Sequence, residues 1–354
     1  MQVLLLTRVN CISICILGRD ELKVGIINVT GYAGMELVRI LYRHPDVKIT
    51  SVTGRSSAGK TLGEVFHHML PIDLTITEDV TESVDLVFSA LPHVSSAKRL
   101  EPLLAQSVRA IDISADFRLE DLSEYERWYE QHPCPQYLGN AVFGLPELHR
   151  KDVSSASLIA NPGCFSTAAI LAMAPAVKAG IVGADIIVDG KTGVSGAGRG
   201  QHPFSEVNES VMAYSVDGHR HSPEIRQELT KLNGTVEPQI TFVPHLVPMT
   251  RGILVTCYAS LQDSTSDEVR ALYQDFYSGE PFVRVVDNPP MTKHTLGNND
   301  CVVYPTVDQQ SNRLIVISCV DNLVKGAAGQ AVQNMNVMFG MDESQSLRQL
   351  ALYP

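Results

Sequence analysis

The residues with the clearest chemical potential are one cysteine and the turn before it. Cys164 follows Asn161-Pro162-Gly163, a strong turn signal, and the apolar run 168–179 that comes next predicts a helix. A cysteine at a helix N-terminus meets unpaired N–H groups and the positive end of the helix dipole, which lower a thiol pKa. We therefore expect Cys164 to be a nucleophile whose thiolate attacks a carbonyl, with the N–H groups holding the oxyanion. The alternative is a small buried cysteine after a loop.

Two histidines follow further along, in His219-Arg220-His221. Ser222 as N-cap and Pro223 in the first turn predict a helix that begins directly after them. A histidine near a reactive cysteine can act as general acid and base. Histidines two residues apart could also bind a metal, but no acidic or thiol partner lies at zinc-like spacing, and we expect no metal.

Composition limits the classes of partner. The chain has 354 residues, which suggests roughly two domains, and its net charge of −11 without a basic run makes nucleic acid an unexpected partner. The cysteines number seven, an odd count, and they are scattered along the chain, which favours reduced thiols in a cytoplasmic protein. No apolar run approaches the ~20 residues that span a bilayer, and we expect no membrane association.

A strand, a glycine loop and a helix open the recognisable part of the chain. The apolar run 23–27 precedes the loop 28–34, and helical spacing follows over 35–42. This order is typical of a dinucleotide-binding turn. The next strand, 47–53, is followed by Arg55, Ser56 and Ser57 instead of the acid that holds the ribose of NAD, so we expect a 2′-phosphate and hence NADP(H).

The pattern of elements changes at Cys164. Short strands alternate with helices before it, which predicts an α/β fold with a Rossmann-type, doubly wound parallel sheet. The rest is β-rich, which predicts an α+β catalytic domain with a mixed or antiparallel sheet. We expect an extension over 1–22, an NADP-binding domain over 23–163 completed by a C-terminal helix over 325–354, and a catalytic and dimerisation domain over 164–324.

Nine motifs, in order along the chain, carry a family resemblance. The chain resembles the N-acetyl-γ-glutamyl-phosphate reductase family, whose fold is shared with aspartate-semialdehyde and glyceraldehyde-3-phosphate dehydrogenases. The matching segments are 31–37, 90–93, 112–118, 143–148, 161–164, 193–199, 219–224, 244–252 and 321–330.

The resemblance implies an NADPH-dependent reduction of N-acetyl-γ-glutamyl phosphate in arginine biosynthesis. In this reaction Cys164 forms a thioester and His221 is the acid and base, with His219 as the alternative. The predicted cofactor-binding residues are Gly31, Tyr32, Ala33, Gly34, Arg55, Ser56, Ser57, Pro92, Gly196 and Asn322. The predicted substrate and phosphate ligands are Arg118, Asn161, Lys191, Ser195, Arg199, Glu224 and Arg251.

Two positions depart from the family pattern, and several alternatives stay open. Asn28 stands where the cofactor loop usually has glycine, and Phe165 stands where tyrosine is common. The same chemistry would serve aspartyl phosphate or a carrier-linked aminoadipyl phosphate, and a non-enzymatic alternative is an NADP-sensing Rossmann protein. We expect a small-molecule acyl phosphate substrate and a homodimer or homotetramer.

Overall fold

Six parallel strands form the first sheet, which confirms the predicted Rossmann-type arrangement. The computed structural model describes residues 21–234, 237–262 and 264–354, so most of the predicted extension over 1–22 lies outside the described residues. The strand order is β2-β1-β3-β4-β6-β5, and it reverses between β1 and β3, where such sheets bind ligands at their carboxyl edge. The strands are β1 (Leu22–Ile27), β2 (Val47–Val52), β3 (Leu86–Ser89), β4 (Arg109–Asp112), β5 (Val142–Phe143) and β6 (Leu158–Ala160).

Helices connect these strands and bury the apolar faces of the sheet. In α1, Leu37, Val38, Ile40 and Leu41 share a buried core with Val24 and Ile26 of β1. The connecting helices are α1 (Tyr32–Leu41), α2 (Leu62–Val65), α3 (Ser95–Ala105), α4 (Leu122–Trp128) and α5 (Pro146–Ser155).

The second sheet has seven strands in the order β11-β12-β13-β10-β7-β9-β8, and it is mixed, as predicted. In β7, buried Ile186 and Val188 alternate with less buried Ile187 and Asp189, the period of two that gives a sheet one buried face. The strands are β7 (Val182–Thr192), β8 (Met212–Ala213), β9 (Gln239–Leu246), β10 (Ile253–Leu261), β11 (Val283–Val285), β12 (Cys301–Asp308) and β13 (Arg313–Val320).

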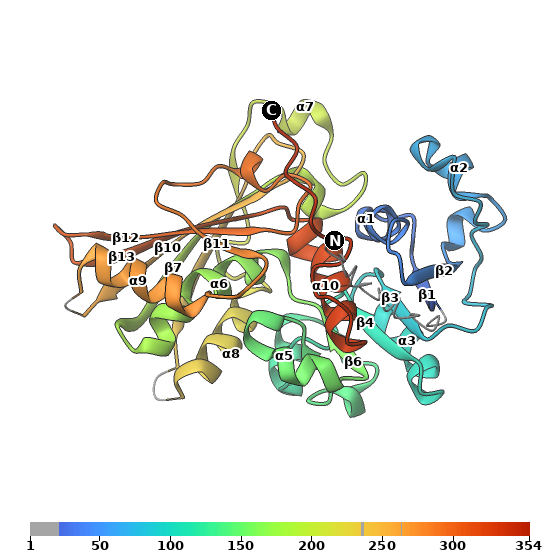
Figure 1. Cartoon of the computed structure of the whole chain (residues 1–354), viewed down its shortest axis with the longest axis horizontal. Coiled ribbons are helices and arrows are strands. Elements are labelled where there is room, and N and C mark those ends of the chain that lie inside the picture. The colour runs from blue at the N-terminus through green and yellow to red at the C-terminus, as the bar shows by residue number, and fades with distance from the viewer. Residues whose placement is uncertain (1–20, 235–236, 263) are drawn as a thin grey trace, which may run out of the picture.

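Three helices cover one face of this sheet: α6 (Cys164–Ala179), α8 (Ser222–Asn233) and α9 (Ser266–Phe276) (Figure 1). Helix α6 is apolar on nearly every side because it lies in the core, where it contacts β10, β13, α8 and α9. Its first residue, Cys164, directly follows the turn after β6 and therefore stands where the two sheets meet.

The end of the chain returns to the first sheet but is less helical than predicted. A single π-helical turn, η6 (Val324–Ala328), leads into α10 (Gly329–Met338), which contacts α1, α5 and β4 (Figure 1). The helix predicted over 325–354 is wrong beyond Met338. There Gly340 adopts a left-handed conformation (φ 64°), and residues 339–354 form turns and irregular structure.

Candidate active site

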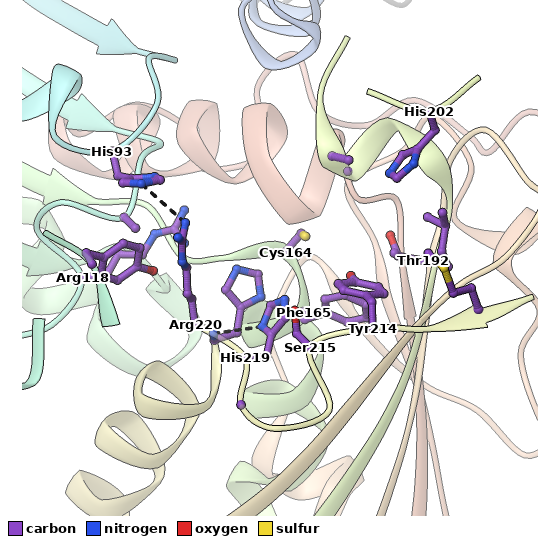
Figure 2. A pocket seen from close by; sticks show the side chains of 18 residues that line it. His93, Arg118, Cys164, Phe165, Thr192, His202, Tyr214, Ser215, His219 and Arg220 are labelled. Atoms are coloured by element: carbon purple, nitrogen blue, oxygen red, sulfur yellow. Dashed lines mark hydrogen bonds between the residues drawn. The ribbon is translucent and has the colours of Figure 1, made fainter. Parts of the chain in front are cut away.

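A cavity of about 600 Å³ opens where loops from both sheets meet, and Cys164 lies in it (Figure 2). Of the predicted residues it also contains His219, His221, Arg118 and Gly196. Its other lining residues are His93, Ala115, Tyr129, Phe165, Thr192, Ala197, His202, Met212, Tyr214, Ser215, Gly218, Arg220 and Leu246.

Cys164 is the first residue of α6, which confirms the predicted placement at a helix N-terminus. Gly163 is the N-cap residue, and no side chain caps the helix. A Cβ atom on Gly163 would lie 2.5 Å from Nε2 of His221, so only glycine lets this imidazole approach the turn before the cysteine. The His221 imidazole therefore packs against the backbone of the residue directly before Cys164.

The rings of the two histidines are in contact, with their centroids 4.7 Å apart, and their hydrogen bonds differ. The backbone N–H of His221 donates to Nδ1 of His219 (3.1 Å), which leaves the His219 proton on Nε2 when the ring is neutral. This contact also fixes the backbone of His221, which is the N-cap of α8; Ser222, predicted as the cap, is the first helical residue instead. Nδ1 of His221 is buried and has no hydrogen-bond partner among the described residues.

Burial keeps both imidazoles uncharged. It lowers the pKa of His221 to about 3, helped by the charge of Arg118, and it lowers the pKa of His219 to about 3, helped by His221. Both imidazoles are therefore neutral at pH 7, which is the form that can accept a proton, but the lowered pKa also makes each ring a weaker base.

The expected low pKa of Cys164 is wrong. Burial raises the pKa of the Cys164 thiol to about 11, although Arg118 and the backbone N–H groups of Phe165 and Cys164 act in the opposite direction. Desolvation therefore outweighs the helix N-terminus. The thiol and the histidines are neutral together, and the thiolate forms only when a base removes the proton.

Alkylation of Cys164 by iodoacetamide is therefore expected to be slow at pH 7 and to accelerate with pH. Only the thiolate reacts, and each pH unit below the pKa lowers its fraction about tenfold. Mass spectrometry of the peptide containing Cys164, after labelling between about pH 6 and about pH 10, measures this rate. A rate independent of pH over this range would show that the sulfur is already ionised.

Arg118 is tied to the turn before Cys164 through Glu224. Its guanidinium donates to Oε1 of Glu224 (2.8 Å) and to the carbonyl oxygens of Asn161 and Ile113 (2.8 and 2.7 Å). Oε2 of Glu224 accepts from the backbone N–H of Gly163 (3.0 Å). Both side chains are buried, so this ion pair fixes the turn; the predicted role of Arg118 and Glu224 as phosphate ligands stays a prediction.

The other three cations predicted as substrate ligands do not line the cavity. Arg251 joins the two domains by pairing with Glu36 of α1 (3.0 Å) and with Asp321 (3.7 Å). Lys191 pairs with Asp189 (2.5 Å), and the guanidinium of Arg199 lies 5.2 Å from the centre of the Phe66 ring. Their roles toward substrate stay predictions.

Three predicted polar ligands hold loops in place. Asn161 donates to the carbonyl of Ala327 (3.1 Å) and accepts from Asn334 (3.0 Å). Asn322 donates to Oγ of Ser195 (2.9 Å) and accepts from the N–H of Gly252 (2.8 Å). These contacts connect the turn before Cys164 to Ala327 and Asn334, and they connect the segment that contains Ser195 to Asn322.

The predicted cofactor loop has the features that a dinucleotide needs. No side chain caps α1 at Gly31, so the first N–H groups, which belong to Tyr32, Ala33 and Gly34, are left for a phosphate. Asn28 takes the left-handed conformation (φ 64°) that glycine usually supplies, and its amide donates to the carbonyl of Ala90 (2.8 Å). The departure at position 28 therefore preserves the turn.

A second arginine accompanies the predicted 2′-phosphate site. Arg55, Ser56 and Ser57 form a short 3-10 turn after β2. Burial and the charge of Arg55 lower the pKa of Arg99, whose guanidinium forms an ion pair with Asp79. Arg99 lies on α3, distant in sequence, and no local motif marks it.

Several residues of the cavity escaped prediction, above all Arg220, Tyr129, His202 and Tyr214. Pro92, by contrast, is exposed beside His93, which does line the cavity. The described residues contain no cluster of three or more His, Cys, Asp or Glu side chains that could hold a metal ion. Within the same ranges, no helix combines the length and the apolar composition that a membrane span requires.

Comparisons with known proteins point in one direction. The model of the semialdehyde dehydrogenase NAD binding domain matches residues 23–156, and that of the semialdehyde dehydrogenase dimerisation domain matches residues 164–322. The chain is 55% identical over 337 residues to the N-acetyl-γ-glutamyl-phosphate reductase of Dehalococcoides mccartyi strain 195, covering 94% of this chain and 99% of that protein. It is 47% identical over 346 residues to the protein of the same name from Desulfotalea psychrophila, with 94% and 100% covered.

A solved structure agrees in fold. The crystal structure of aspartate semialdehyde dehydrogenase with NADP from Candida albicans superimposes with a TM-score of 0.69 at 15% identity, covering 90% of this chain and 98% of that one.

Proposed function

The chain belongs to the N-acetyl-γ-glutamyl-phosphate reductase family, and from this membership we propose that it reduces N-acetyl-γ-glutamyl phosphate with NADPH to N-acetylglutamate semialdehyde and phosphate. The observation that carries the proposal is the placement of Cys164 and the His221 imidazole in one cavity at the N-terminus of α6. A thiol, a neutral imidazole and free backbone N–H groups are the parts that acyl transfer to sulfur requires.

Covalent catalysis by Cys164 accounts for the first half of the reaction. Sγ attacks the carbonyl carbon of the acyl phosphate, and His221 accepts the thiol proton as the S–C bond forms. The C–O bond to phosphate then breaks, and the leaving phosphate takes that proton. N–H groups at the start of α6 stabilise the oxyanion, and Arg118 adds positive charge beside the sulfur.

The second half needs a reductant. When bound, NADPH supplies hydride to the thioester carbon. The residues that would hold it are the N–H groups of 32–34 at α1 and, for its 2′-phosphate, Arg55 with Ser56 and Ser57. The same α6 N–H groups stabilise the second oxyanion, and release of the aldehyde returns the Cys164 thiolate, which is then protonated.

Replacing each histidine by asparagine separates their roles. His221→Asn is expected to lower kcat about 100-fold, because it removes the proton acceptor beside Cys164. His219→Asn is expected to cost less, because His219 acts on His221 by accepting its backbone N–H. Steady-state kinetics of the two variants measures this order, and a larger loss at position 219 would transfer the acid–base role to that residue.

A spectrophotometric assay of NADP⁺ reduction tests the proposed substrate. With phosphate present, N-acetylglutamate semialdehyde should be oxidised with a kcat/KM at least about 100-fold above that of aspartate semialdehyde, since a site built for one set of polar groups rejects analogues that lack them. Equal or better use of aspartate semialdehyde would assign the chain to aspartyl phosphate instead.

We further propose that the uncovered face of the seven-stranded sheet is the subunit interface of a homodimer, which could pair into a homotetramer. The match to a dimerisation domain covers this sheet. On the face opposite α6, Tyr258 of β10 lies between Ile187 and Ile315, and Tyr304 pairs with Ile317. All five are partly exposed in the single chain, and apolar faces of this kind are buried between subunits.

A further inference from the structure

Arg220 places a positive charge at the rim of the cavity. Its side chain reaches from the His219–His221 segment across to the first domain, where its guanidinium lies 5.0 Å from the centre of the Tyr129 ring and 3.5 Å from Nε2 of His93 (Figure 2). Among the described residues it forms no salt bridge. An aromatic ring and a histidine thus hold the guanidinium in place without neutralising it.

The other guanidinium of the cavity, that of Arg118, differs from Arg220 in its burial and in its ion pairing. Arg118 is buried and paired with Glu224, and it is the cation whose charge acts on the sulfur of Cys164. Arg220 is exposed, and its guanidinium lies against Tyr129 and His93. The cavity therefore has an inner cation beside the reacting sulfur and an outer cation at its rim.

The substrate of the proposed function has an anionic group at each end of its carbon chain. Its phosphoryl group is bonded to the carbon that Cys164 attacks and must lie near the sulfur. Its carboxylate is separated from that carbon by three further carbon atoms and must lie farther out. A guanidinium binds a carboxylate through two parallel N–H bonds.

We propose that Arg220 binds the carboxylate of the amino-acid part of the substrate and thereby determines substrate specificity. This proposal rests on the proposed function, because it assumes that the substrate is an N-acylated amino acid activated on its side chain. It assigns a residue to substrate recognition that forms no part of the covalent chemistry.

The reverse reaction tests the proposal, because there the carboxylate and the phosphate arrive on separate molecules. Arg220→Gln is expected to raise KM for N-acetylglutamate semialdehyde about 10- to 100-fold, with KM for phosphate and for NADP⁺ within about twofold of the original protein. Arg220→Lys keeps the charge but loses the paired N–H donors of the guanidinium. Its KM for N-acetylglutamate semialdehyde should lie between those of the original protein and Arg220→Gln. Arg127→Gln removes an exposed cation on α4 and serves as the charge-matched control, with all three KM values unchanged.

Removing the carboxylate from the substrate provides the complementary measurement. 4-Acetamidobutanal is the same aldehyde without that group. The original protein should prefer the natural aldehyde in kcat/KM by about 10- to 100-fold, and Arg220→Gln should lose most of this preference. An equal preference in both proteins, an unchanged KM for the aldehyde, or a larger rise in KM for phosphate would each overturn the proposal. Failure of the original protein to oxidise N-acetylglutamate semialdehyde would instead refute the proposed function.

Discussion

Cys164→Ser is expected to lower kcat for acyl-phosphate reduction at least about 10³-fold while NADPH binding is retained. A serine hydroxyl is a far weaker nucleophile than a thiol that can pass its proton to His221, so the covalent step should fail. The cofactor-binding features lie on α1 and after β2, and they do not involve the cysteine. The loss should therefore fall on kcat and leave the Kd of NADPH unchanged.

Three measurements on the variant make this prediction specific. Stopped-flow or steady-state assays give the rate, fluorescence titration gives the Kd of NADPH, and mass spectrometry after mixing with substrate detects the acyl-enzyme. The original protein should gain the mass of the acyl group and Cys164→Ser should not. Cys134→Ala, a change at a buried cysteine that the cavity does not contain, is the control and should retain activity. Near-normal turnover of Cys164→Ser would refute the assignment of the nucleophile.

Local sequence signals predicted the placement of the chemistry well. The turn Asn161-Pro162-Gly163 and the apolar run after Cys164 need only near neighbours to form a strand–turn–helix unit, and the structure contains it. The same holds for the strand, loop and helix that end at α1, where an asparagine at 28 takes the conformation of a glycine. Strand alternation likewise identified the parallel sheet and the mixed sheet.

The partners of charged side chains were the part that sequence could not predict. Arg251 follows a strand in sequence, and we predicted it as a substrate ligand. Its partner Glu36, however, lies on a helix 215 residues away. The sign of the Cys164 pKa shift was missed for a related reason, since desolvation depends on everything packed around the sulfur and not on the helix alone. Of the two arginines that line the cavity, long-range packing pairs Arg118 with Glu224, whereas Arg220 forms no salt bridge with the described residues.

Lys325→Met is expected to destabilise the protein by about 3–5 kcal/mol, the usual cost of leaving one partner of a buried ion pair unpaired. Lys325 is fully buried in the turn η6, and its Nζ donates to Oε1 of Glu147 (2.6 Å) and to Gln333 (2.7 Å). Burial disfavours the Glu147 carboxylate, but Lys325 and Gln333 outweigh it and hold its pKa below the ordinary value. Methionine would fill the space of the lysine and leave that carboxylate without its cation.

The double variant Lys325→Met/Glu147→Leu distinguishes an unpaired charge from lost packing. Removing both charges should recover most of the free energy of unfolding in urea, because the cost of Lys325→Met arises from the stranded carboxylate. If the double variant is as unstable as Lys325→Met, the shape of the lysine matters and its charge does not. The recovered protein should still have reduced activity, since Gly326, the next residue, packs against Cys164 so closely that an added Cβ would lie 2.8 Å from the cysteine Cβ. The free energy of unfolding would then be restored while kcat stays low. This result would show that the ion pair fixes the turn on which the position of Cys164 depends.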